Sequence, residues 1–162
     1  MTTIPSLSKL WEKEECPLVD GFIFSDGTII KFDIANISPG KLQFEEIGIT
    51  SIVELHNHDS ENYKNLYHST IQKVHQSYKY MVGEGSWGGD GYVACLDLKT
   101  DEILWIFTSD RINPIIDIEF SNNKIIAKNN LNSIFSIEVI FSNIKRAIVK
   151  QINNDTTTVD KK

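Results

Sequence analysis

Apolar and polar residues alternate along much of the chain, as expected for strands that bury one face. Residues 21–35 read GFIFSDGTIIKFDIA, so that two alternating apolar runs flank Asp26-Gly27. An Asp-Gly pair between such runs is a strong signal for a tight turn. We therefore predict a β-hairpin over residues 21–35, and a further strand over residues 49–55.

The same alternation returns in the second half of the chain. Short polar segments at residues 99–101 and 121–123 separate neighbouring apolar runs and predict two more hairpins. Further strands are predicted at residues 78–82, 92–98, 103–108, 115–120, 124–128, 134–141 and 147–152.

Two segments have helical spacing instead. Residues 6–15 predict a short N-terminal helix, with Ser6 as its cap and three apolar residues on one face. An amphipathic helix is predicted at about residues 60–75, where apolar side chains recur at helical spacing and Asp59 or Ser60 could cap it. Because the strands come in local hairpins, we predict an α+β, β-dominated, mostly antiparallel fold.

The composition is that of a globular protein. The chain has 162 residues, of which 41% are apolar, and we predict a single globular domain over 1–152 and a disordered polar tail over 153–162. No apolar run approaches the roughly 20 residues that span a bilayer, and we see no secretory signal, so we expect a cytoplasmic protein. Cys16 and Cys95 lack a CxxC partner, and we expect two buried free thiols.

The negative charge is unevenly distributed. The net charge is −6, and residues 84–119 alone contain eight acids and two bases. The whole chain has only two arginines, Arg111 and Arg146. A nucleic-acid-binding protein would normally present a basic, arginine-bearing face, so the charge argues against that class. It favours a basic protein partner, or serves solubility alone.

A glycine-rich segment, GEGSWGGDG, occupies residues 83–91 and contains a literal GxGxxG pattern. Dinucleotide binding requires a helix directly after the loop, but here the chain continues into a predicted strand. We therefore interpret the segment as a glycine-rich hairpin or bulge. Within it, Trp87 and Asp90 are candidates for an exposed recognition tip.

All four histidines lie within 20 residues of one another, at His56, His58, His68 and His75. His56 and His58 follow the predicted strand at residues 49–55, and an HxH pair at a strand end places both imidazoles on one face. His68 and His75 would share a face of the predicted helix. A metal site built from these side chains is the alternative that remains open, beside an ordinary polar strand-to-helix loop.

One segment resembles a blade of the quinoprotein-type β-propellers. In residues 91–107, GYVACLDLKTDEILWIF, the pair Leu96-Asp97, Thr100 and Trp105 match the docking motif of those blades. Because 162 residues cannot close a ring of about 40-residue blades, we interpret the match as shared hairpin chemistry without a quinone site.

The whole chain also resembles small bacterial immunity proteins of contact-dependent-inhibition and other polymorphic toxin systems. The likeness lies in its acidic, Asn/Ile/Lys-rich composition and in the GEGSWGGDGYV loop that leads to ILWIF. It implies a non-enzymatic cytoplasmic protein that binds one cognate toxin, often a basic nuclease, and occludes the active site of that toxin. We expect it to bind no cofactor, no nucleic acid and no membrane. The resemblance assigns no contact residues. From the acidic segment 84–119 we expect contacts at positions predicted in loops or at strand ends: Glu84, Trp87, Asp90, Asp101, Glu102 and Asp110.

Two other functions stay open at this point. A metal-dependent hydrolase would use His56 and His58, with His68 or His75. A β-rich scaffold or adaptor module would make no specific use of the acidic surface.

Overall fold

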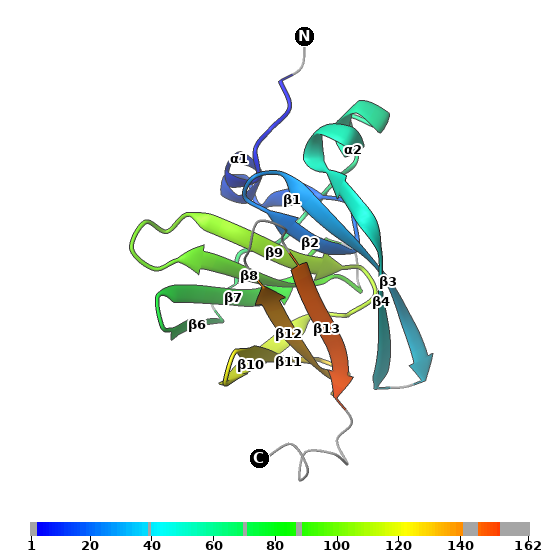
Figure 1. Cartoon of the computed structure of the whole chain (residues 1–162), viewed down its shortest axis with the longest axis vertical. Coiled ribbons are helices and arrows are strands. Elements are labelled where there is room, and N and C mark those ends of the chain that lie inside the picture. The colour runs from blue at the N-terminus through cyan, green and yellow to red at the C-terminus, as the bar shows by residue number, and fades with distance from the viewer. Residues whose placement is uncertain (1–2, 39, 70, 87–88, 141–145, 153–162) are drawn as a thin grey trace.

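The computed structural model describes residues 3–38, 40–69, 71–86, 89–140 and 146–152, and strands dominate it (Figure 1). The elements of the first half are α1 (Leu7–Glu12), β1 (Glu15–Pro17), β2 (Gly21–Phe24), β3 (Thr28–Ser38), β4 (Lys41–Ser51), α2 (Ile52–His58), β5 (Tyr63–Asn65) and β6 (Gln72–His75). Those of the second half are β7 (Tyr78–Glu84), β8 (Gly91–Asp97), β9 (Ile103–Ser109), β10 (Ile115–Ser121), β11 (Lys124–Asn129), β12 (Ile134–Ile140) and β13 (Arg146–Ile152).

Seven antiparallel strands form the larger sheet, in the order β4-β3-β2-β9-β8-β7-β6. The hairpin predicted over residues 21–35 is confirmed as β2 and β3. At its turn the Thr28 N–H donates to the Asp26 carboxylate, and Gly27 takes a φ of +92°, which glycine adopts without strain. The predicted β8–β9 hairpin is confirmed as well, as is the β-dominated, mostly antiparallel class.

A four-stranded sheet, β10-β11-β12-β13, covers one face of the larger sheet. The hairpin predicted around residues 121–123 is confirmed as β10 and β11, and the two late predicted strands are confirmed as β12 and β13. Between the sheets lies an aromatic and aliphatic core that includes Phe22, Trp105, Phe107 and Phe135. Because aromatic rings bury large areas, this layer contributes much of the hydrophobic stabilisation.

The opposite face of the larger sheet is covered by α1, by α2 and by the small β1–β5 sheet. The predicted N-terminal helix is confirmed: Ser6 accepts a hydrogen bond from the Lys9 N–H, and Leu7, Leu10 and Trp11 are buried. Since both faces of the central strands are covered, β8 reads as a nearly continuous apolar run rather than an alternating one.

Side chains join the two sheets at both lateral seams. At the β4–β13 seam, the Leu42 N–H donates to Oε1 of Gln151 at 2.7 Å. At the β6–β10 seam, Nζ of Lys73 donates to the Ile118 carbonyl at 2.7 Å and lies 2.9 Å from the Asp117 carboxylate. The sandwich is thus held along its edges by side chains that replace a continuous backbone ladder.

The strand predicted over residues 49–55 is only partly correct, because β4 ends at Ser51 and α2 begins at Ile52. The Ser51 side chain accepts a hydrogen bond from the Glu54 N–H at 3.1 Å, which is an N-cap bond. The Ser-x-x-Glu spacing of a capping box was present in the sequence. It outweighs the β propensity of Ile52 and Val53.

The amphipathic helix predicted at about residues 60–75 is wrong. That segment contains β5, β6 and irregular chain. The residues that suggested a helical face do not share a core, since Leu66 is fully buried whereas Tyr67, Ile71 and Val74 are exposed. Pairing of β6 with β7 and of β5 with β1 satisfies the backbone there, so tertiary contacts override the local spacing. The tail predicted over 153–162 lies outside the described residues.

Candidate functional site

The HxH pair does not form the arrangement that was predicted for it. His56 and His58 lie on α2, not at a strand end. Residues two apart on a helix point about 200° away from each other, so the two imidazoles face different directions. His56 Nδ1 instead lies 2.8 Å from the Tyr63 hydroxyl, a contact that ties α2 to β5.

The other two histidines are placed against aromatic rings in different parts of the fold. The His68 ring lies 4.1 Å from that of Trp11 between centroids. The His75 ring stacks on Phe120 at 4.3 Å, with only 2° between the planes. Within the described part of the chain, no three His, Cys, Asp or Glu side chains are grouped so as to hold a metal ion. The four histidines are therefore not brought together, and a metal centre built from them has no geometric support.

Both cysteines are buried free thiols, as predicted. Burial raises the pKa of Cys16 to about 12, and it raises the pKa of Cys95 to about 12 as well. Because the thiolate is the reactive form, each thiol is a poor nucleophile at neutral pH. The cysteines belong to the cores of the two sides of the larger sheet.

Asp90 does not form the exposed recognition tip that was predicted. It is fully buried, and its carboxylate lies 3.2 Å from the ammonium of Lys64, which is buried too. The glycines around it allow this close packing. A Cβ on Gly91 would lie 2.0 Å from the Asn113 carbonyl oxygen, and one on Gly85 would lie 2.9 Å from the Asp90 carboxylate. The interpretation of the segment as a structural glycine loop fits this packing.

The remaining predicted contacts do not form one surface. Glu84 and Asp110 lie at one end of the β7–β8–β9 strands, whereas Asp101 and Glu102 lie at the turn between β8 and β9, at the other end. Strands of seven residues at about 3.3 Å per residue separate the two ends by roughly 20 Å. All four residues are exposed. Trp87 lies outside the described residues.

The acidic segment 84–119 is also partly neutralised by lysines from elsewhere. Lys79 forms an ion pair with Asp101, and Lys73 forms one with Asp117 at 2.9 Å. The hydrogen bond from Lys73 holds the pKa of Asp117 below its usual value. The surplus of acids that the sequence places in this segment is thus smaller at the surface than the residue count indicates.

A different acidic surface emerges at the edge of the larger sheet. It consists of the second half of β4 and the first turn of α2, and we call it the acidic edge: Glu45, Glu46, Ile47, Ile49, Val53 and Glu54. β4 is the outermost strand, and no described strand pairs with the outer side of this half (Figure 1). Ile47, Ile49 and Val53 are 57%, 59% and 50% exposed. Exposed apolar groups with acids around them are typical of protein-interaction surfaces.

The acids of this edge are not neutralised by ion pairs within the described part of the chain. Asp33 of β3 lies directly opposite Glu45 in the strand register, which places two like charges side by side. Thr50 donates a hydrogen bond to Glu54 at 2.9 Å. Among the described bases, none forms an ion pair with Asp33, Glu45, Glu46 or Glu54. The sequence showed adjacent acids and isoleucines here, but not that β4 is an edge strand.

No helix within the described ranges is long and apolar enough to cross a membrane. No protein-family model matches the chain, and no curated protein or solved structure matches it either.

Proposed function

We propose that this protein is a non-enzymatic, cytoplasmic inhibitor that binds a basic protein toxin and occludes its active site, as immunity proteins do. The observation that supports this most strongly is the acidic edge, where an outer strand exposes apolar side chains among acids that no described base neutralises. This surface replaces segment 84–119 as the proposed main contact.

The strand edge suits such a partner in two ways. The N–H and C=O groups on the outer side of β4 can pair with an extended segment of another chain. The acids attract a cationic surface and accelerate association, while Ile47, Ile49 and Val53 are available for burial. An antiparallel pairing of two copies centred here would bring Glu45 and Glu46 of both copies together, which disfavours self-association.

The test takes basic toxin domains encoded by genes adjacent to that of this protein. Co-expression measures protection, and kinetic binding measures complex formation. Replacing Glu45 and Glu46 by lysine should slow association by at least about tenfold at low salt, and the difference should shrink as salt screens the charges. The matched control replaces Asp101 and Glu102 by lysine, which makes the same change in net charge at a distant turn.

We expect the control to change the association rate much less, because Lys79 already neutralises Asp101. Equal effects of the two double variants would show that only net charge matters, which is the scaffold alternative. Absence of both protection and a complex with the toxin would refute the proposed function.

A further inference from the structure

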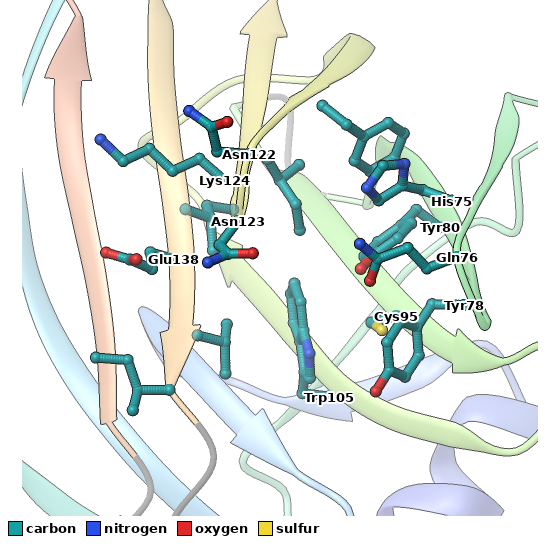
Figure 2. A pocket seen from close by; sticks show the side chains of 15 residues that line it. His75, Gln76, Tyr78, Tyr80, Cys95, Trp105, Asn122, Asn123, Lys124 and Glu138 are labelled. Atoms are coloured by element: carbon teal, nitrogen blue, oxygen red, sulfur yellow. The ribbon is translucent and has the colours of Figure 1, made fainter.

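A cavity of about 330 Å³ opens between the two sheets, at the edge of the larger sheet opposite the acidic edge (Figure 2). It lies between the turn that joins β6 to β7, the turn that joins β10 to β11, and the second half of β12. Its volume is at the lower end of the range for small-molecule sites, which suits a ligand of one or two rings.

The two long walls of the cavity differ in chemistry. One wall is aromatic: the Tyr80 ring lies 5.0 Å from that of Phe120 and 6.4 Å from that of Trp105. The facing wall on β11 and β12 is aliphatic and includes Ile125 and Ile137. An aromatic wall facing an aliphatic one forms a slot that favours a flat ring.

Two neutral amide side chains are directed into the slot. In Figure 2 the amides of Gln76 and Asn123 point from opposite sides toward the space above Trp105. Within the described part of the chain, neither amide is hydrogen-bonded to another residue. The charged ends of Lys124 and Glu138 point away from Trp105 (Figure 2). A primary amide both donates and accepts, so each of the two can pair with a ring edge that carries both kinds of group.

We propose that this cavity binds a small, neutral, planar heteroaromatic ring with donor and acceptor groups on its edge, of the nucleobase type. Amide side chains recognise such edges by paired hydrogen bonds, and aromatic side chains stack on such rings. A sugar of similar size would bring some of its hydroxyls against the aliphatic wall of Ile125 and Ile137, which cannot hydrogen-bond them, and this costs binding energy. The site is independent of the proposed inhibitor function, since it lies at the other edge of the sheet.

The test is isothermal titration of the full chain with hypoxanthine and with uracil, and with glucose as the comparison ligand. We expect saturable binding of at least one base with a Kd below about 1 mM, and weaker or undetectable binding of glucose. Replacing Gln76 or Asn123 by alanine should weaken binding about tenfold. Asn123→Asp keeps the shape and should also weaken binding, because it removes the NH₂ donor.

Three further variants separate the site from general effects. Val139 lines the cavity, and Val139→Phe should fill it and abolish binding, with an unchanged fold checked by circular dichroism. Lys124→Gln and Glu138→Gln should change the Kd less than twofold. The proposal is overturned if neither base binds with a Kd below about 10 mM, or if glucose binds more tightly than both bases. It is also overturned if Val139→Phe still binds a base, or if Lys124→Gln or Glu138→Gln changes the Kd more than the alanine variants of Gln76 and Asn123 do.

Discussion

At the scale of single residues, burial decides the role of each charged group. Lys64 and Asp90 are almost completely inaccessible and lie 3.2 Å apart, whereas Lys73 and Asp117 form a similar pair that is about half exposed. Removing one member of a buried pair leaves a charge without compensation in a medium of low polarity, which is far more costly than losing an exposed pair. The glycine-rich loop is thus fastened to β5 by an interaction with a large energetic consequence.

We therefore expect Lys64→Met to lower the free energy of unfolding by about 3–5 kcal/mol, because Asp90 would remain buried without its cation. The control Lys9→Met should cost no more than about 1 kcal/mol, because its ion pair with Glu12 is exposed. Urea denaturation of both variants measures the difference. The double variant Lys64→Met/Asp90→Leu should regain part of the loss, and equal losses in both single variants would contradict the argument.

At the scale of elements, local capping competes with strand propensity, and α2 is the clearest case. Ile52 and Val53 are β-branched residues that favour a strand, and they directly follow β4 in the chain. The Ser51 hydroxyl nevertheless accepts a hydrogen bond from the Glu54 N–H, which starts a helix, and Thr50 of the preceding strand donates one to the Glu54 carboxylate. This helix start also positions Val53 and Glu54 on the acidic edge.

Ser51→Ala should lower the free energy of unfolding by about 1 kcal/mol, since it removes the N-cap acceptor. Ser60→Ala is the matched control, because Ser60 is exposed and follows the helix. Thermal denaturation compares the two variants, and amide hydrogen exchange at Glu54 reports on the cap directly. A loss for Ser60→Ala equal to that for Ser51→Ala would show that the cap contributes nothing.

At the scale of the whole molecule, the two sheets enclose one core but are not joined by a continuous backbone ladder at their seams. Gln151 spans the β4–β13 seam, and Lys73 spans the β6–β10 seam. The β6–β10 seam lies at the side where the 330 Å³ cavity opens. The width of the cavity mouth therefore depends on the distance between the two sheets at this seam. The exposure of the acidic edge depends on β4 remaining an outer strand.

Gln151→Ala should lower the free energy of unfolding by about 1–2 kcal/mol, because the Leu42 N–H loses its acceptor. It should also accelerate hydrogen exchange of the Leu42 amide. Gln43→Ala is the control, since Gln43 is exposed and follows Leu42 on β4. If exchange at Leu42 responds equally to both changes, Gln151 does not hold the seam.

The sequence by itself determined the elements whose signals are local: the hairpin at Asp26-Gly27, the later hairpins and the helix capped by Ser6. These depend on turn and cap chemistry within a few residues, which the order of side chains encodes directly. Only the tertiary structure decided that residues 60–75 are strands and loops, that Asp90 is buried, and that β4 lies at the edge. Such outcomes depend on which distant segments pair and cover one another, because burial is a property of the assembled sheets. The acidic edge and the cavity exist for the same reason, since each joins residues whose exposure no local pattern specifies.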